Sequence, residues 1–361
     1  MLKFHPLRVL DVRPEAEDAL AITLAVPQAL RAEYRGSPGQ HVVLRAPADG
    51  GELRRTYSLT NEPGAEALRL LVRVHPGGHM SQVLQRLAVG QEVQTLPPNG
   101  SFTPHAVALG TGLRVAFAAG SGITPVLSVT RAVLAAGGSM MIFYGNRSAA
   151  RAMGLEALQG LKDRYPQQLA LHFVMSREPQ EVALYNGRLD GAKVRELAQA
   201  FFDPRTVGEY FVCGPGEMDR EVCAALTQLG VPAERVRVEH FGVAGQTDPA
   251  PVGARQPAEG MAEGMAEGMA EVTVVLDGRR RTFTMPVEGE TVLEAAERAG
   301  IDLPFSCRSG VCSTCRTKIV RGEVRMDQNY ALEEWELEQG YVLACQSRCL
   351  SGELEIDYDE K

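Results

Sequence analysis

Hydrophobic and polar positions follow three different patterns along the chain. Up to about residue 109, apolar residues come in short alternating stretches separated by Pro, Gly and Asp, as in 21–26, 41–44 and 68–74. A period of two is typical of strands that bury one face. We therefore expect residues 1–109 to form an antiparallel β-barrel domain.

From residue 113 onward, strand-like and helix-like stretches alternate. The predicted strands are 115–119, 140–144, 169–175 and 210–213, and the predicted helices are 125–136, 155–164, 192–202 and 217–229. Strands that alternate with helices form a parallel sheet covered on both faces. Residues 110–242 are therefore expected to form an α/β doubly wound domain.

Residues 243–270 have a different composition. Three prolines are followed by the tetrapeptide Ala-Glu-Gly-Met, repeated three times from Ala258 to Met269. Glycine at every fourth position opposes a helix, and the segment has little apolar surface to bury. It is predicted to be a flexible low-complexity linker, with a short amphipathic helix built on the methionines as the alternative.

The last part of the chain, residues 271–361, returns to a mixed pattern. Two strand-like stretches, 272–276 and 281–285, flank the turn signal Asp277-Gly278, and a helical stretch follows at 292–299. A hairpin followed by a helix and a long loop is the layout of an α+β domain of the β-grasp type. The protein is thus expected to be multidomain.

Four cysteines in this last part give the most specific chemical signal. Cys307, Cys312, Cys315 and Cys345 are spaced C-x4-C-x2-C and then, after 29 further residues, C. This is the plant-type spacing for a 2Fe-2S cluster, whose irons are held by soft thiolates. A structural zinc site is the alternative, but it usually has two paired arms of ligands rather than three cysteines and one. The small and polar residues between the first three cysteines could point their amides at the sulfides.

Composition and charge exclude several classes of protein. The hydrophobic share of 45% is ordinary, and no apolar run approaches the roughly 20 residues of a membrane span. The first ten residues are too polar for a signal peptide, and three further cysteines are too few for a disulfide framework, so a cytoplasmic location is expected. No basic cluster suggests nucleic-acid binding.

The net charge of −8 is unevenly distributed. Residues 271–361 contain 18 acidic and 11 basic side chains, a balance of −7, whereas residues 1–242 contain 23 and 25, a balance of +2. The acidic excess is either an ordinary solvated surface or a face that steers a basic electron-transfer partner.

A candidate flavin site lies in the β region. The motif Arg55-Thr56-Tyr57-Ser58 is followed by Leu59, and alternation along a strand directs Arg55 and Tyr57 to the same side. A guanidinium can hold a pyrophosphate, and a phenol ring can lie against an isoalloxazine. The pair alone could equally be structural. Further along, Gly77 and Gly78 allow a close backbone approach to a phosphate, and a helix begins near Met80 and Ser81.

A candidate dinucleotide site lies in the α/β region. Gly120-Ser121-Gly122-Ile123-Thr124-Pro125 joins a predicted strand to a predicted helix, with Pro125 in the first helical turn. The stretch Cys213-Gly214-Pro215-Gly216-Glu217-Met218 ends a later strand of the same sheet, where ligands gather. A buried strand cysteine is the alternative for Cys213.

In these motifs the chain resembles the ferredoxin-NADP reductase superfamily, which carries R-x-Y-S, G-G-x-x-S and C-G-P-x-x-M. The resemblance implies that Arg55 binds the pyrophosphate of FAD, that Tyr57 stacks on the ring and that Ser58 lies near its reactive nitrogen. It also implies that Cys213 lies beside the hydride-carrying carbon of the nicotinamide, so Tyr57, Ser58 and Cys213 are the candidate catalytic residues. The histidines at positions 75, 79 and 240 receive no catalytic role.

The choice between NADPH and NADH depends on charge near the ribose, because a 2′-phosphate requires arginines. Arg147 follows the predicted strand 140–144, and Ser176, Arg177 and Arg188 follow the next one. By resemblance to the family these residues hold the phosphate, so NADPH is favoured. The alternative is that they are solvated loop residues and that Glu178 binds a free ribose.

The order of domains implies a route for electrons. A hydride carries two electrons and a 2Fe-2S cluster accepts one at a time, so a flavin must stand between NADPH and the cluster. This order resembles the reductase subunits of multicomponent oxygenases, most closely those of phenylacetyl-CoA epoxidases, so the expected partner is an oxygenase or hydroxylase component. Phthalate-dioxygenase-type reductases, with FMN and NADH, share the domain order.

Two other functions remain open. One is a reductase for another acceptor, such as a hybrid-cluster protein, a steroid hydroxylase or a desaturase. The other is a redox-sensing module without an enzymatic role.

Overall fold

The computed structural model describes residues 3–48, 51–105, 109–240, 268–332 and 334–360. The chain divides into two compact units, one of residues 4–241 and one that contains residues 242–361. Most of the predicted linker lies outside the described residues. Its last two residues do not belong to a linker, because a strand already begins at Met269.

The first unit begins with a six-stranded antiparallel sheet. Its strands are β1 (His5–Ala16), β2 (Ala19–Ala25), β3 (His41–Ala48), β4 (Gly51–Ser58), β5 (Ala67–Arg73) and β6 (Glu92–Thr95), in the order β4-β3-β6-β1-β2-β5. A bridge between Leu59 and Leu70 joins the two ends of this order, so the sheet closes into a barrel. Alternate residues such as Ile22, Leu24 and Leu68 fill its interior. Helix α1 (His79–Gln85) contacts β4.

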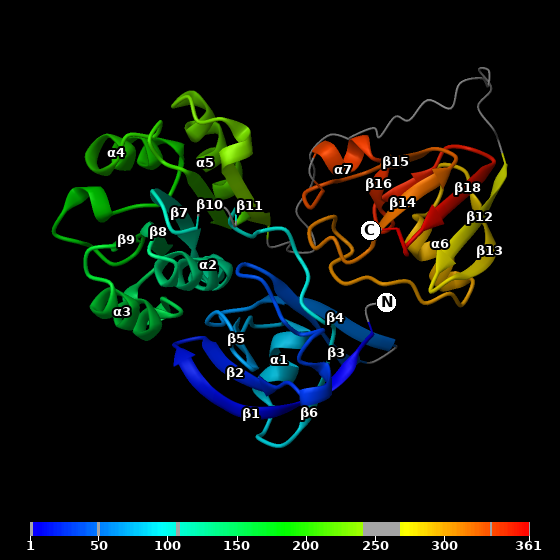
Figure 1. The fold of residues 1–361 in the computed structure, drawn as a ribbon, viewed down its shortest axis with the longest axis horizontal. Helices are drawn as coiled ribbons and strands as arrows, with labels where there is room; N and C mark the ends of the chain where they lie inside the picture. The colour runs from blue at the N-terminus through cyan, green and yellow to red at the C-terminus, as the bar shows by residue number, and fades with distance from the viewer. Residues whose placement is uncertain (1–2, 49–50, 106–108, 241–267, 333, 361) are drawn as a thin grey trace. The chain divides into compact units, whose positions relative to one another are not determined.

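The second sheet of this unit is parallel and has five strands. They are β7 (Leu113–Ala119), β8 (Ser139–Asn146), β9 (Leu169–Met175), β10 (Glu209–Gly214) and β11 (Val236–His240), in the order β11-β10-β7-β8-β9. Helices α2 (Ile123–Ala135) and α3 (Leu155–Arg164) contribute to the core on one face, and α4 (Gly191–Phe201) and α5 (Gly216–Gln228) to the core on the other (Figure 1). Because helices cover both faces, β7 and β10 are almost continuously buried. The expected doubly wound domain is confirmed.

The second unit contains a mixed sheet. Its strands are β12 (Met269–Leu276), β13 (Arg279–Pro286), β14 (Arg316–Arg321), β16 (Tyr341–Leu343) and β18 (Glu353–Asp357), in the order β13-β12-β18-β14-β16. The short strands β15 (Val324–Met326) and β17 (Ser347–Cys349) form a separate pair. Helices α6 (Val292–Arg298) and α7 (Glu334–Glu338) complete the domain. The expected hairpin turns at Asp277 and Gly278, whose φ angles of 53° and 66° suit the tight turn.

None of the helices in the described part of the chain is long and apolar enough to span a membrane.

Candidate functional site

The cysteine loop is shaped by three residues in left-handed conformation. Arg308, Gly310 and Ser313 have φ angles of 54°, 74° and 48°. Non-glycine residues rarely adopt this conformation, and they are found where a site demands it. The result is that the amides of Ser309 and Val311 both donate to the Cys307 sulfur, at 3.4 Å. Two loop amides thus donate to a ligand sulfur, and the expectation that loop amides meet the sulfides of the cluster stays a prediction.

The four thiols share one buried environment. Hydrogen bonding with Cys312 and Cys345 and with the Ser309 amide holds the pKa of the Cys307 thiol well below its ordinary value. The pKa values of Cys312 and Cys345 are raised well above theirs, chiefly because their thiols hydrogen-bond Cys307 and because both are buried. Four buried thiolates cannot coexist without a cation, so the donor set fits a metal cluster.

The spacing of the ligands distinguishes a cluster from a single ion. A structural zinc site usually has two paired arms of ligands, whereas here three cysteines lie in one loop and the fourth follows after 29 further residues, as in a plant-type 2Fe-2S site. The cysteine spacing therefore favours the cluster. Bound there, it supplies one-electron transfer.

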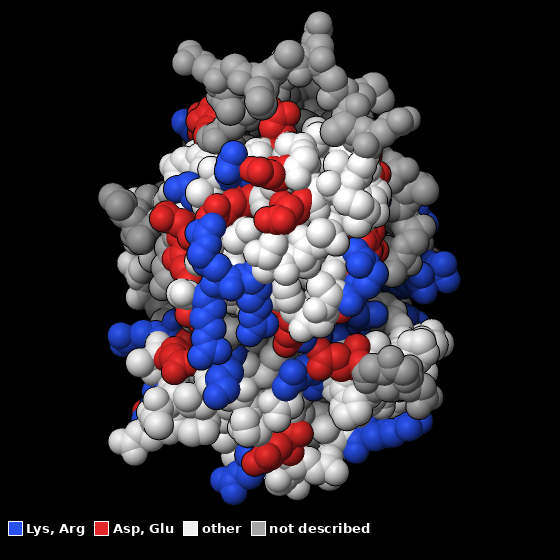
Figure 2. All heavy atoms as spheres, turned by 90° about the vertical axis from the view of Figure 1, so that its right-hand side faces the viewer, with Lys and Arg blue, Asp and Glu red and all other residues white. Residues whose placement is uncertain are grey.

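Arginines, rather than carboxylates, flank the ligand cysteines. Arg308 pairs with Glu297, Arg316 with Glu336 and Arg348 with Asp327. Figure 2 also shows acidic and basic side chains interspersed on the displayed face. The negative balance of this part of the chain is thus neutralised close to the cluster, and a uniformly acidic face around the ligands is not found among these residues.

The flavin motif lies at the end of β4. Arg55 is exposed, Tyr57 is half-buried and Ser58 is buried. Burial raises the pKa of Tyr57 above its ordinary value, so the phenol stays neutral. The Ser58 hydroxyl is buried without a protein partner, as expected of a group that awaits a polar atom of a ligand. These residues fit a flavin.

The glycine turn before α1 is held in place by hydrogen bonds of the Ser81 side chain. Ser81 Oγ accepts from the His75 amide at 3.1 Å and donates to the Gly78 carbonyl at 2.9 Å. Met80 is buried in the barrel core. Gly77 has a φ of 79° and open space around it. A phosphate here would therefore meet Gly77, Gly78 and backbone amides rather than the side chains of Met80 and Ser81.

The dinucleotide turn, the 3-10 turn Gly120–Gly122, is pressed against the end of β10. A Cβ on Gly122 would lie 1.9 Å from the carbonyl oxygen of Cys213, so only glycine fits. Thr124 Oγ1 donates to the Ser121 carbonyl at 2.9 Å and Pro125 lies in the first turn of α2. The two predicted motifs thus meet at the carboxyl ends of adjacent strands, where nucleotides bind in such sheets.

Cys213 itself is fully buried at the end of β10. Burial raises the pKa of its thiol well above the ordinary value, and the nearby carboxylates of Glu239 and Asp219 raise it further. Gly214 faces the sulfur of Met218, and Pro215 begins α5 as its N-cap. The cysteine is thus a neutral thiol, suited to contact an apolar ring edge rather than to act as a nucleophile.

Three of the candidate 2′-phosphate residues, Arg147, Ser176 and Arg177, lie together at the ends of β8 and β9, and Arg188 follows Gly187, whose amide donates to the carbonyl of Met175 at the end of β9. The Arg177 amide donates to the Arg147 carbonyl at 2.9 Å, and the Ser176 amide donates to the Asn146 carbonyl at 2.9 Å. Arg147, Arg177 and Arg188 are exposed, and none pairs with a described carboxylate. Glu178 accepts from the Ala149 amide at 2.9 Å and so supports the neighbouring loop.

Sequence reasoning missed a second layer of polar residues at this junction. His41 is the cross-strand partner of Ser58, and Glu239 is the partner of Cys213. His41 Nδ1 lies 3.6 Å from Glu239 Oε1; the His41 side chain is buried and the Glu239 side chain is 11% exposed. The outer atoms, His41 Nε2 and Glu239 Oε2, have no protein partner. The only sequence signal for His41 was its place at the start of the alternating stretch 41–44, and Glu239 lies in none of the predicted strands.

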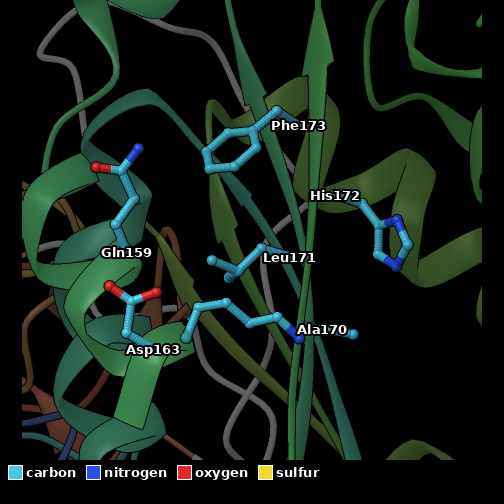
Figure 3. Close-up of a pocket in the computed structure, with 7 residues that line it drawn as sticks. Gln159, Asp163, Ala170, Leu171, His172 and Phe173 are labelled. Atoms are coloured by element: carbon cyan, nitrogen blue, oxygen red, sulfur yellow. The ribbon is translucent and has the colours of Figure 1, made fainter. Parts of the chain in front are cut away.

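A shallow groove between α3 and β9 lies apart from these motifs. Figure 3 shows Gln159 and Asp163 of α3 facing Leu171 and Phe173 of β9, with His172 on the opposite side of the strand. Lys162, which also lines it, already donates to the carbonyls of Pro166 and Leu169. None of the predicted site residues lines this groove.

Comparisons with known families agree with this arrangement. The model described as "Oxidoreductase FAD-binding domain" matches residues 8–103, "Oxidoreductase NAD-binding domain" matches 117–224, and "2Fe-2S iron-sulfur cluster binding domain" matches 274–350. The chain is 37% identical to a subunit of the 1,2-phenylacetyl-CoA epoxidase of Escherichia coli (strain K12), over 100% of this chain and 99% of that protein. It belongs to this family of ferredoxin-reductase-type oxygenase reductases.

Other members are similar over nearly the full length. The ferredoxin reductase component of 3-ketosteroid-9-alpha-monooxygenase from Rhodococcus rhodochrous is 33% identical, over 98% of this chain and 96% of that protein. Among solved structures, phthalate dioxygenase reductase has a TM-score of 0.58 at 22% identity, covering 98% of both chains. An intact type IV self-sufficient cytochrome P450 monooxygenase has a TM-score of 0.68 at 24% identity, covering 98% of this chain and 41% of that one. These two structures establish the fold alone.

The reductase is therefore an oxidoreductase with sites for FAD, a nicotinamide dinucleotide and a 2Fe-2S cluster. FAD, rather than the FMN alternative, is the flavin that the matching family binds.

Proposed function

We propose that this reductase oxidises NADPH and supplies electrons, through FAD and the 2Fe-2S cluster, to the oxygenase component of a phenylacetyl-CoA epoxidase. The chemistry that the two bound groups supply is the conversion of a hydride into single electrons. The observation that supports the acceptor is 37% identity, along the whole chain, to a protein of such an epoxidase.

The observation that supports NADPH is the group of three arginines. Arg147, Arg177 and Arg188 gather at the ends of β8 and β9 and have no described carboxylate partner. A 2′-phosphate is the ligand that unpaired arginines at this place would recognise. Glu178, the alternative ribose ligand, has one oxygen committed to the Ala149 amide.

The remaining residues have roles that follow from their positions. Arg55 holds the pyrophosphate of FAD, Tyr57 packs on its ring, and Ser58 with Leu59 continues the strand along it. On the nucleotide side the turn residues Gly120, Gly122, Thr124 and Pro125 meet the pyrophosphate. The end of β10 and the start of α5 meet the nicotinamide with Cys213, Gly214, Pro215 and Met218.

We also place the domain boundaries at 109/110 and 242/243. The unpaired thiols of the described cysteines fit a reducing compartment, so we place the protein in the cytoplasm.

Two measurements test the proposal. Ferricyanide reduction should proceed with a kcat/KM for NADPH about tenfold or more above that for NADH, because two or more charged hydrogen bonds to the 2′-phosphate are lost with NADH. Exchanging Arg147 and Arg177 for Met should remove most of that difference. A wild-type preference for NADH would overturn the choice of cofactor.

The acceptor is tested by reconstitution. The reductase should support consumption of phenylacetyl-CoA by a phenylacetyl-CoA epoxidase oxygenase component at a higher rate than ketosteroid hydroxylation by a 3-ketosteroid-9-alpha-monooxygenase. The second system is the matched alternative, because its reductase component is 33% identical to this chain. A faster rate with the steroid enzyme would reassign the acceptor.

A further inference from the structure

The loop of residues 148–154, which we call the 148–154 loop, lies next to the candidate 2′-phosphate arginines. It begins directly after Arg147 and contains the 3-10 turn Ala149–Arg151. It ends at Gly154, whose φ of 70° starts α3. The Arg147 carbonyl accepts a hydrogen bond from the Arg177 amide. A shift of this loop would therefore move the guanidinium groups of both arginines.

The flavin barrel holds this loop from outside the nucleotide domain. The turn between β1 and β2 ends in Asp18, whose carboxylate binds the guanidinium groups of both Arg73 and Arg151. Arg73 Nη2 also donates to the Arg151 carbonyl at 2.9 Å. The Asp18 side chain is only 20% exposed, so these pairs are less screened than pairs at an open surface.

Two neighbouring backbone contacts extend this attachment. The Glu17 amide donates to the Ala150 carbonyl at 3.0 Å, and Glu15 Oε1 accepts from the Gly154 amide at 2.8 Å. The end of β1 and the β1–β2 turn therefore contact the loop at Ala150, Arg151 and Gly154. Figure 1 shows the end of β1 approaching the side of the nucleotide domain that carries α3.

The nucleotide domain holds the same loop from within. Tyr144 Oη lies 2.9 Å from the Gly120 carbonyl and 3.1 Å from the Met153 carbonyl, and it accepts from the Met153 amide at 3.0 Å. Burial raises the pKa of Tyr144, so its hydroxyl keeps the proton that it donates. One hydroxyl thus connects the pyrophosphate turn to the 148–154 loop.

We propose that Asp18, a residue of the flavin barrel, is a positioning residue for the 2′-phosphate of NADPH. By holding Arg151 it fixes the 148–154 loop where Arg147, Ser176 and Arg177 converge on the phosphate. The flavin barrel thereby contributes to dinucleotide selectivity without touching the dinucleotide. This inference rests on the proposed preference for NADPH.

The test is binding of two probes to the FAD-loaded full-length protein by calorimetry. The probes are adenosine 2′,5′-bisphosphate, which carries the phosphate in question, and adenosine 5′-monophosphate, which lacks it. Asp18→Asn should weaken the bisphosphate roughly three- to tenfold, the effect of re-ordering one or two side chains on binding. The affinity for the monophosphate should stay within about twofold of the wild-type value, since no contact to the rest of the nucleotide is changed.

Two control variants accompany Asp18→Asn. Asp18→Glu keeps a carboxylate for both arginines and should recover most of the selectivity. Asp203→Asn removes an exposed aspartate that pairs with Arg205 on the segment before β10, and it should change neither affinity.

Each result decides between the two proposals. If wild-type protein binds both probes equally, the preference for NADPH fails and this inference fails with it. If wild-type protein prefers the bisphosphate and Asp18→Asn retains that preference, only the inference is overturned. An equal loss of affinity for both probes, or loss of bound FAD, would mean that Asp18 merely supports the fold. Either result would also overturn the inference.

Discussion

His41 of the barrel and Glu239 of the parallel sheet meet as a largely buried pair, with Nδ1 and Oε1 separated by 3.6 Å. Each residue is the cross-strand neighbour of a candidate catalytic residue, Ser58 for His41 and Cys213 for Glu239. The pair therefore joins the two domains at the point where flavin and nicotinamide are proposed to meet. A Cβ on Gly100 would lie 2.9 Å from His41 Nδ1, so the imidazole occupies space that only a glycine at position 100 leaves open.

The energetic link between these two residues is measurable by a double-mutant cycle. His41→Ala alone leaves a buried carboxylate without its partner and should lower the free energy of unfolding by about 1–3 kcal/mol. Because the two side chains are in contact, their effects on the free energy of unfolding should not add. The double variant His41→Ala/Glu239→Ala should be destabilised by about 0.5–3 kcal/mol less than the sum of the two single variants. Denaturant unfolding of the FAD-loaded protein gives these values. Simple additivity would show that the two side chains do not interact.

The close approach of the pyrophosphate turn to β10 predicts a second effect. Gly122→Ala places a methyl group 1.9 Å from the Cys213 carbonyl, a contact that must push the turn away from the strand. NADPH-dependent ferricyanide reduction should fall by about tenfold or more, because an ångström-scale displacement of a positioning group is costly in rate. Bound FAD should be unchanged.

Gly216→Ala is the matched control for that substitution. Gly216 lies at the start of α5 near the same site, and a Cβ there has nothing within 4 Å. This variant should keep wild-type activity. Equal losses in both variants would mean that the site tolerates no added methyl group, and that the contact between Gly122 and Cys213 has no special role.

A pH dependence follows from Cys223 on α5. Burial, with a smaller contribution from the Asp219 carboxylate, raises the pKa of its thiol to about 11. The reactive thiolate is the deprotonated form, so its fraction grows about tenfold per pH unit below that pKa. Alkylation of Cys223 by iodoacetamide, followed by peptide mass spectrometry, should therefore keep rising from about pH 8 to about pH 10.

The controls for this measurement are an ordinary thiol and a charge variant. An unperturbed cysteine peptide should begin to level off near pH 9.5, about one unit above its pKa. Asp219→Asn should shift the rise in Cys223 alkylation to lower pH, since it removes the nearby negative charge that helps to raise the pKa of this thiol. A plateau for wild-type Cys223 near that of the peptide would contradict the raised pKa.

The sequence predicted the elements whose pattern is local. Strand β9 and helix α3 have the predicted bounds, because each is a continuous periodic stretch with clear ends. Strand β1 was not predicted, since Pro6, Asp11 and Pro14 interrupt its alternation and pairing with β2 and β6 determines it instead. Strand β6 has only four residues, too few for a pattern.

The motifs were predictable for the same reason, and the network between them was not. The cysteine spacing and the glycine turns are contiguous in sequence, so their chemistry can be recognised locally. Asp18 and Arg151, by contrast, are 133 positions apart, and no pattern at either position indicates the other. His41 and Glu239 are joined only because two sheets meet there, which depends on tertiary packing.

The separation of the chain into two units predicts that the two halves of the electron pathway can be uncoupled. Cys312 lies in the unit of residues 242–361, whereas the flavin and dinucleotide motifs lie in residues 4–241. Serine is a far weaker ligand for iron than a thiolate, so Cys312→Ser should lose the cluster and with it the reduction of cytochrome c. Reduction of ferricyanide by NADPH through the flavin should continue near the wild-type rate.

Cys349→Ser is the control for this loss. Cys349 is also buried in the second unit, but its sulfur donates to the Ser351 carbonyl at 3.1 Å, and the burial that raises its pKa involves none of the four ligand thiols. This variant should keep the visible absorbance of the cluster and both activities. If Cys312→Ser kept full cytochrome c reduction while Cys349→Ser lost it, Cys349 would be a ligand and the spacing that assigns Cys312 would be wrong.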